Sequence, residues 1–408
     1  MDVGFPVAGT AKDQFRGSNR FNKMKQVGSA VVKNGEKTLS IGIIGAGLAG
    51  LTCAIMIRKQ GYLVTVIEKK QFPFHRVCGE YVSNEILPFL SSLNLDINCL
   101  NPSRISRLLL SSPVGKSMEA PLEMGGFGIS RYVFDNYLYQ EALACGIKFI
   151  FAKANNILFE NNEFSIDLSI GTTVTCQLAI AAYGKRANLD QKLNRSFFYQ
   201  RSPYIGVKYH IKTDLPKDLV RLDSFTGGYC GTCKIEDDLF NLCYLSETKN
   251  LKAHASISEM ERKVLFKNPH IRQIFENSDF VFEKPEVINE ISFERKSLVE
   301  DHVLFCGDAA GMITPLCGNG MAMAIHSGKI LAECIIQNGN EIRLTNRLRL
   351  ESEYKEKWKK HFLLRLNTGR FVQRLFLNPR LSHSAISVLK RSNFLCNMLM
   401  KSTHGKSF

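Results

Sequence analysis

LSIGIIGAGLAG, residues 39–50, joins an apolar run to glycines at positions 45, 47 and 50. The apolar run predicts a buried strand that ends at Ile44, and residues 48–60 predict a helix that ends at Gly61. Residues 62–68 carry the β-branched, alternating pattern of a second strand. Strand, glycine turn, helix and strand in this order form a βαβ unit, which predicts an α/β fold with a parallel sheet.

The glycine turn has the residues that a dinucleotide site requires. Gly45 permits a tight turn, Gly47 beside Ala46 lets backbone amides approach a pyrophosphate, and Gly50 lets the helix pack against the sheet. The helix N-terminus adds unpaired N–H groups and the positive end of its dipole. Glu68 ends the second strand, where a carboxylate accepts hydrogen bonds from a ribose diol and repels a 2′-phosphate. The segment therefore predicts a site for FAD or NAD rather than NADP.

A second strand-to-helix junction lies more than 250 residues further on. A buried strand predicted at 303–306 leads into Gly307-Asp308, and a long helix is predicted from about residue 319. Asp308 could bind ribityl hydroxyls, while Gly318, Gly320 and Met321 could place helix amides near the pyrimidine edge of a reduced flavin. One extended ligand held at two places favours FAD.

Composition limits the remaining classes of protein. The 408 residues suffice for two or three domains, and 45% apolar with 22% charged residues is ordinary globular composition. Twelve cysteines are too sparse for a disulfide scaffold, and the first residues lack the apolar core of a secretory signal, so we expect free thiols in the cytoplasm. A formal charge of +15 favours an anionic partner. Residues 38–57 carry no charge and could span a bilayer by length, but the glycine turn explains them better.

We expect a Rossmann-like FAD-binding domain, a substrate domain with a mixed β-sheet, and a helical C-terminal segment. A disordered basic arm is predicted at 1–37. The predicted FAD-binding domain is discontinuous, with ranges 38–85, 128–190 and 296–340, and the predicted substrate domain comprises 86–127 and 191–295. Strand patterns in the middle of the chain include 105–110, 164–170, 174–182, 204–211, 239–245 and 281–293.

Five stretches together carry a resemblance to a known family: GAGLAG, the terminal Glu68, FHRVCGEYVS, SRYVFDNYLYQEA and GDAAGMITPLCGNGMAMA. They resemble the group A flavoproteins with the para-hydroxybenzoate hydroxylase-like fold, and within it the geranylgeranyl reductase-like branch. The resemblance covers most of residues 39–375. It implies that Gly45, Gly47, Gly50 and Glu68 hold the ADP half of FAD.

The resemblance also assigns residues beyond the first turn. It implies that Arg131 approaches the middle of the cofactor, that Asp308 binds the ribityl chain, and that the Cys78-Gly79 pair lies near the flavin and the substrate cavity. Arg76 lies on the loop just past the ribose strand and could contact a flavin phosphate or the substrate.

The sequence departs from the family pattern at two places. An Asp-Gly pair normally serves both FAD and NAD(P)H, but 182–186 reads AYGKR, with Tyr183 where the acid belongs. Direct reduction by NAD(P)H is therefore in doubt, and Lys185 and Arg186 could instead meet a phosphate, a protein reductant or solvent. The only tryptophan is Trp358, so the tryptophan-rich signature of flavin halogenases is absent.

Several side chains have both a chemical and a packing interpretation. Cys78 could be a substrate-side proton donor or a small buried apolar residue. Cys230 and Cys233 have the spacing of a redox pair but lie in a strand-and-turn region, and no zinc site or other metal site is predicted. His75 is predicted at the polar surface, His326 in the core, and Tyr229 facing the flavin.

Residues 341–408 hold 15 Lys and Arg residues against four Asp and Glu residues, interleaved with aromatic side chains. Such a basic amphipathic segment could lie on an anionic membrane, as a peripheral association, or could be a solvated helix that covers the substrate domain. No nucleic-acid module is present, and the oligomeric state is not predicted.

Three functions are compatible with these patterns. The leading hypothesis is an FAD-dependent oxidoreductase that transfers hydride from flavin to a carbon–carbon double bond of an isoprenoid-like or polyene-like lipid. The second is an FAD-dependent monooxygenase that hydroxylates an aromatic or polyketide-like substrate. The third is a flavin-binding protein that docks on membranes without its own catalysis.

Overall fold

The computed structural model describes residues 37–200, 202–338 and 344–408, so the arm predicted at 1–37 lies outside the described residues except for Lys37. Six strands form the first sheet in the order β17-β18-β10-β1-β2-β6. They are β1 (Lys37–Ile44), β2 (Tyr62–Glu68), β6 (Lys148–Phe151), β10 (Leu178–Ala181), β17 (Val299–Glu300) and β18 (Val303–Phe305). All neighbours are parallel except β17 and β18, which confirms the predicted parallel sheet.

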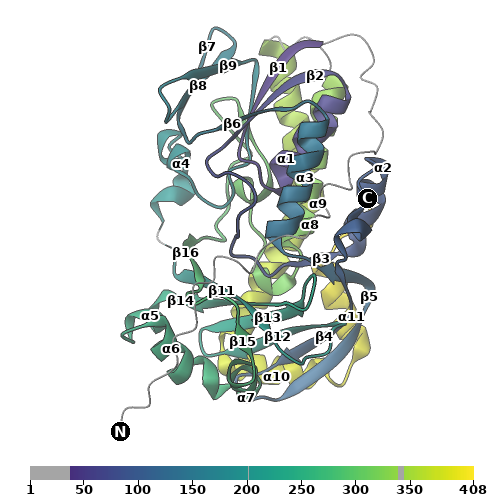
Figure 1. The fold of residues 1–408 in the computed structure, drawn as a ribbon, viewed down its shortest axis with the longest axis vertical. Helices are drawn as coiled ribbons and strands as arrows, with labels where there is room; N and C mark the ends of the chain where they lie inside the picture. Colours follow the sequence, from purple (N-terminus) through teal and green to yellow (C-terminus); the bar gives the residue numbers. More distant parts are fainter. Residues whose placement is uncertain (1–36, 201, 339–343) are drawn as a thin grey trace. The chain divides into compact units, whose positions relative to one another are not determined.

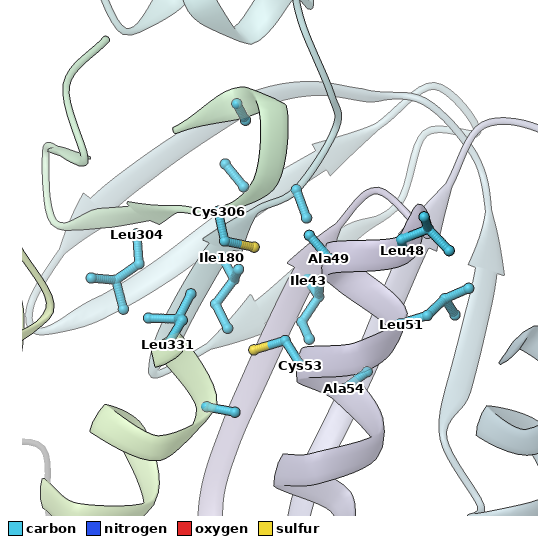
Figure 2. Packing of buried hydrophobic residues seen from close by; sticks show 14 of the residues in the cluster. Ile43, Leu48, Ala49, Leu51, Cys53, Ala54, Ile180, Leu304, Cys306 and Leu331 are labelled. Atoms are coloured by element: carbon cyan, nitrogen blue, oxygen red, sulfur yellow. The ribbon is translucent and has the colours of Figure 1, made fainter. Parts of the chain in front are cut away.

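Three helices pack on this sheet: α1 (Leu48–Lys59), α3 (Arg131–Ala144) and α8 (Gly320–Asn338). Figure 2 shows the core they enclose, where side chains of β1, β10 and β18 meet those of α1 and α8. Ile43, Ile180, Leu304, Cys53 and Leu331 are each at most 1% exposed. Each large apolar side chain buried in this way contributes roughly 1.5–3 kcal/mol. The sheet is therefore a rigid base for the loops at its edge.

A three-stranded antiparallel sheet lies against β1 and β10: β7 (Ala154–Glu160), β8 (Glu163–Leu168) and β9 (Thr173–Cys176). A Cβ on Gly42 would lie 2.8 Å from Cys176 Sγ, so glycine at this position lets the two sheets approach. The single strand predicted at 174–182 is wrong, because β9 and β10 belong to different sheets. The chain changes sheets at Gln177, whose Oε1 accepts a hydrogen bond from Ser40 N at 2.7 Å.

The second large sheet has nine strands and is mixed, as predicted. Its members are β3 (Tyr81–Ser83), β4 (Ser103–Ser111), β5 (Ser117–Gly128), β11 (Tyr204–Lys212), β12 (Leu219–Phe225), β13 (Gly228–Lys234), β14 (Phe240–Glu247), β15 (Asp279–Phe280) and β16 (Glu286–Ile291). Only β4 and β12 pair in parallel. The strand predicted at 281–293 is replaced by β15 and β16, because Pro285 between them cannot donate to a ladder.

Both faces of the nine-stranded sheet are covered. The helices α5 (Thr248–Lys252), α6 (Ile257–Lys263) and α7 (Pro269–Glu276) bury Met260, Ile271 and Ile274 against one face. The long α9 (Leu344–Leu377), α10 (Pro379–Leu389) and α11 (Asn393–Thr403) supply a cluster on the opposite face (Figure 1). Two short helices, α2 (Leu87–Ser92) and α4 (Asn188–Lys192), complete the described elements of this type.

The uncharged stretch 38–57 is not a transmembrane helix. It divides into the strand β1, the glycine turn and most of α1. Across the described ranges, no helix combines the length and the hydropathy needed to cross a bilayer.

Candidate functional site

The turn between β1 and α1 assigns a different task to each glycine. Gly45 has a φ of +106°, and a Cβ there would lie 2.6 Å from Ala182 O, so only glycine fits. A Cβ on Gly50 would lie 2.1 Å from Gly45 O, which explains the close packing of α1 on the sheet. A Cβ on Gly47 would meet only the Arg131 guanidinium, at 3.7 Å. The backbone at Gly47 is therefore open to an approaching ligand.

Glu68 lies at the carboxyl end of β2, directly beside this turn. Its side chain accepts hydrogen bonds from Ala46 N at 2.9 Å and from Lys70 N at 3.1 Å. Arg76 Nη2 approaches Glu68 Oε2 at 3.5 Å but has no hydrogen-bond partner among the described residues. The Glu68 carboxylate and a guanidinium nitrogen with an unused hydrogen-bond donor thus lie together beside the glycine turn. This pair suits a ribose diol and a phosphate.

Asp135 organises two of the predicted cofactor residues and was missed by the sequence analysis. Arg131 Nε donates to Asp135 Oδ1 at 2.6 Å, and Arg76 Nε donates to Asp135 Oδ2 at 3.0 Å. Asp135 is 2% exposed and lies one turn into α3, whose N-terminus is capped by Ser130 Oγ. The signal that could have found it is the i, i+4 spacing of Arg131 and Asp135, which places the two side chains on one face of a helix.

Replacing Asp135 with asparagine is expected to weaken FAD binding roughly tenfold and to lower the free energy of unfolding by about 1–3 kcal/mol, because two guanidinium groups lose their shared charged acceptor. Flavin fluorescence titration and urea unfolding measure the two effects. Asp218→Asn is the matched control, since Asp218 pairs with Arg107 at the exposed surface and should change neither quantity appreciably. Unchanged flavin affinity in Asp135→Asn would contradict the assignment.

Two segments form the candidate cofactor site, and we call them cradles: the first is the glycine turn with Glu68, and the second is the junction at Gly307-Asp308. The second cradle lies at the end of β18, on the same edge of the sheet as the first. A Cβ on Gly307 would be 2.8 Å from Ala49 Cβ, so the two junctions are adjacent despite their separation in sequence. Burial raises the pKa of Asp308, while nearby cations led by Lys296 oppose that change. Lys296 Nζ donates to Asp308 O at 2.8 Å and to Lys185 O at 2.6 Å. Burial lowers the pKa values of both lysines to about 8.

One cavity of about 700 Å³ connects the two cradles. Gly45, Gly47, Glu68, Arg76, Cys78, Arg131, Asp308, Gly318, Gly320 and Met321 all line it. Two of the predicted cofactor residues, Ala46 and Gly50, do not line the cavity. Ala46 N donates a hydrogen bond to Glu68, and Gly50 packs beneath the turn. These residues fit FAD, which needs one long cavity with a phosphate end and a polyol end.

The same cavity continues into an apolar region that the sequence analysis did not foresee. Its wall there comes from the nine-stranded sheet and from the C-terminal helices: Leu108, Leu110, Leu122, Val220, Leu222, Tyr229, Val372, Phe376, Leu389, Cys396, Leu399 and Met400. Tyr229 belongs to this apolar wall and is 3% exposed. A long apolar ligand could therefore lie in the same cavity as the cofactor.

The comparisons with known proteins agree with this geometry. A family model described as an NAD(P)-binding Rossmann-like domain matches residues 43–83. Digeranylgeranylglycerophospholipid reductase 1 of Methanosphaera stadtmanae is 25% identical over 70% of this chain and 72% of its own length. Conditioned medium factor receptor 1 of Dictyostelium discoideum is 22% identical over 88% of this chain and 76% of its own length.

The flavin-dependent halogenase CmlS shares the fold, with a TM-score of 0.70 and 19% identity. The match covers 82% of this chain and 64% of the halogenase, slightly less than two thirds of its length. The chain has a Rossmann-like domain and shares its fold with flavin-dependent enzymes. Its cofactor is FAD, and Gly47, Glu68, Arg131 and Asp308 would hold it in the cavity.

Beside Cys78 the protein buries a charged cluster that the sequence patterns did not reveal. Glu80 is fully buried and has a φ of +54°. Its carboxylate accepts hydrogen bonds from Lys208 Nζ and Arg131 N, and it contacts His210 Nε2 at 2.7 Å. Burial would raise the pKa of Glu80, but Lys208 and His210 outweigh it and lower the pKa to about 2. The cluster therefore holds an ionised carboxylate under the Cys78-Gly79 loop.

The prediction that His75 lies at the polar surface is wrong. It lines the cavity, stacks on Tyr132 with ring centroids 4.6 Å apart, and lies 5.3 Å from the His210 ring. Burial, together with Lys208 and His210, lowers the pKa of His75 to about 4. The aromatic residues around it make a half-buried neutral imidazole more favourable than a charged one.

This pKa shift predicts a pH dependence of stability. The unfolded chain binds a proton at His75 below pH 6.5, whereas the folded chain binds one only near pH 4, so stability is lost as the pH falls between these values. His75→Gln should reduce the loss between pH 7 and pH 5 by about 1 kcal/mol, a figure discounted for partial exposure. Urea midpoints at both pH values measure it. Parallel losses in the wild-type protein and the variant would contradict the shift.

Tyr183, which replaces the expected acid, is tied to a buried network. Tyr183 OH donates to Asp190 Oδ1 at 2.6 Å, and Arg195 Nη1 donates to the same oxygen at 2.8 Å. Arg186, the second of the two basic residues, donates to Phe198 O and pairs with Glu290 at 3.0 Å. Asp190 is therefore engaged inside the protein. Lys185 lines the cavity, and its amine donates a hydrogen bond to Asn289 O.

The remaining candidates have packing roles. Cys230 and Cys233 lie in β13, and their odd separation places the two thiols on opposite faces of the strand, which excludes a redox pair. His326 is 4% exposed and stacks on Phe408 at 3.9 Å, as expected for a core histidine. Among the described residues, no group of three or more potential ligands could hold a metal ion.

Proposed function

We propose that this FAD-dependent oxidoreductase reduces carbon–carbon double bonds of an isoprenoid-like or polyene-like lipid. The continuous cavity carries the proposal, because it joins the polar cradles of the cofactor to a wall built almost entirely from apolar side chains. Such a wall offers few hydrogen bonds and therefore selects for length and apolar surface rather than for polar groups. The similarity to a digeranylgeranylglycerophospholipid reductase supports the same substrate class.

The chain contributes binding, exclusion of water and a proton. Bound FAD supplies hydride chemistry. Leu110, Leu222 and Phe376 bury an apolar substrate and keep water from it. Burial raises the pKa of the Cys78 thiol, so that Cys78 keeps its proton at neutral pH and can hold it toward the cavity. Asn241 and Cys233 of the nine-stranded sheet fix the backbone beside Cys78, since both donate hydrogen bonds to Gly79 O.

The test is anaerobic reduction of a polyprenol by the dithionite-reduced protein, followed by mass spectrometry. A gain of two hydrogens per double bond supports the proposal, and an unchanged polyprenol with flavin that stays reduced contradicts it.

Cys78→Ala is expected to slow this turnover by roughly 10²-fold while the visible flavin spectrum stays the same, because a positioned proton donor contributes that much. Equal rates in Cys78→Ala would remove Cys78 as the donor.

An oxygen-dependent reaction is the second candidate, because the halogenase fold accommodates this chain over most of its length. Trp358 offers no support for halogenation, since it is 5% exposed and packs against Phe362 in the core. Product formation that requires oxygen, with or without halide, would favour this candidate over the reductase. Absence of product under every condition would leave flavin binding without catalysis.

A further inference from the structure

The helices α9, α10 and α11, which line the apolar end of the cavity, carry an unusually large share of the exposed apolar side chains. The described residues include 18 exposed large apolar side chains, and nine of them lie between residues 344 and 408, under a fifth of the described chain. These nine are Leu344, Leu348, Leu363, Leu364, Phe371, Leu381, Val388, Phe394 and Met398. Scattered single residues of this kind are normal, so their concentration on α9–α11 requires an explanation.

The spacing on α11 separates two faces. Cys396, Leu399 and Met400 line the cavity, whereas Phe394 and Met398 are 74% and 55% exposed. At 100° per residue, the exposed pair lies on the side of the helix opposite the lining residues. One face of α11 thus belongs to the apolar wall of the cavity, and the opposite face exposes apolar side chains at the protein surface.

The C-terminal half of α9 repeats this arrangement. Val372 and Phe376 face the cavity, and Leu364 and Phe371, 72% and 60% exposed, follow each other at i, i+7 on a different face, about 110° around the helix. Lys360 and Arg374 lie on that same outer side and are exposed. Apolar and basic side chains are therefore mixed on one outer stripe, which is the composition of helices that lie at a membrane interface.

Charge selects the occupant of this surface. Residues 344–408 contain 14 Lys and Arg residues against three Asp and Glu residues, so the segment holds most of the excess positive charge of the chain. A second copy of the chain would bring another strongly basic surface and be repelled. An anionic bilayer supplies both the opposite charge and a medium for the exposed phenylalanines.

We propose that the outer faces of α9 and α11 dock on an anionic lipid bilayer, which places the apolar end of the cavity beside the lipid from which the substrate enters. This inference rests on the proposed function for the identity of the substrate, but the docking surface itself does not require catalysis. The two aromatic anchors are Phe371 on α9 and Phe394 on α11, and the basic residues along the same helices hold them at the surface.

Cosedimentation of the full chain with vesicles tests the docking. The wild-type protein should bind phosphatidylcholine vesicles that contain phosphatidylglycerol, should bind pure phosphatidylcholine vesicles much more weakly, and should be released by salt. Phe371→Glu combined with Phe394→Glu should reduce binding by roughly tenfold or more. The matched control is Leu158→Glu combined with Ile170→Glu, two exposed apolar residues near the remote β7–β9 sheet, which should change binding less than about twofold.

Three outcomes would overturn the docking: no binding by the wild-type protein, equal binding to both vesicle types, or equal losses in the two double variants. A change of mass in light scattering for the Phe371/Phe394 variant, without a change in vesicle binding, would assign the surface to a second copy. Turnover of a detergent-dispersed polyprenol separates this test from that of the proposed function. Retained turnover with lost docking, or the reverse, shows which of the two proposals fails.

Discussion

Replacing Glu80 with glutamine is expected to lower the free energy of unfolding by about 3–5 kcal/mol, the usual cost of leaving one member of a buried ion pair without its partner. Lys208 is 1% exposed and its ammonium donates to Glu80 and to Arg76 O. Glutamine keeps the shape of the side chain but removes the charge. Lys208 would then have to release its proton or draw water into the core.

Chemical denaturation monitored by circular dichroism measures this effect. Glu80→Gln combined with Lys208→Met removes both charges, and most of the lost stability should return, since an apolar replacement of a buried pair is often neutral. The double variant thereby separates the unpaired charge from the unusual backbone of residue 80, because both variants place glutamine at a φ of +54°. A loss below about 1 kcal/mol in the single variant would mean that the cluster is hydrated.

The glycine turn gives the second large effect, as a contrast between two minimal substitutions. Gly50→Ala is expected to prevent folding to the native state, since the added methyl group would lie 2.1 Å from Gly45 O. Gly47→Ala is expected to fold normally, because Gly47 has an ordinary φ of −86° and room for a methyl group. That methyl group would stand where backbone amides approach the pyrophosphate, so FAD affinity should fall roughly 100-fold.

The two variants control for each other. Circular dichroism and thermal unfolding report the fold, and the yellow colour of the purified protein with its flavin titration reports the site. Loss of both fold and flavin in Gly47→Ala would show that the turn is only a packing element. Full flavin content in Gly47→Ala would place the pyrophosphate elsewhere.

Local patterns were sufficient for the first βαβ unit. The strand predicted at 62–68 coincides with β2, and the predicted helix 48–60 extends one residue beyond α1. Both predictions succeed because glycines and the period of the apolar residues determine these elements within a few neighbouring residues. The strand predicted at 174–182 failed for a global reason. Nothing in its own side chains indicates that Gln177 turns the chain from one sheet to another.

The charged cluster could not be predicted for a similar reason. Glu80 is separated from Lys208 and His210 by 128 and 130 residues, and each is unremarkable in its own segment. Only the pairing of β11 within the nine-stranded sheet brings Lys208 and His210 to the loop before β3. Asp135, by contrast, lies one helical turn after Arg131 and was within reach of a pattern argument.

The strand order of the first sheet also constrains how the protein can be made. β10 lies between β1 and β18, so the edge that carries Gly45 and Asp308 is complete only after β18 has been synthesised, more than 250 residues after the glycine turn. Until then the nascent βαβ unit has an open flank and long loops still to close. Both ends of the cofactor site therefore exist only after β18 has joined the sheet, and a polypeptide that ends before residue 303 would lack the Asp308 end of the site.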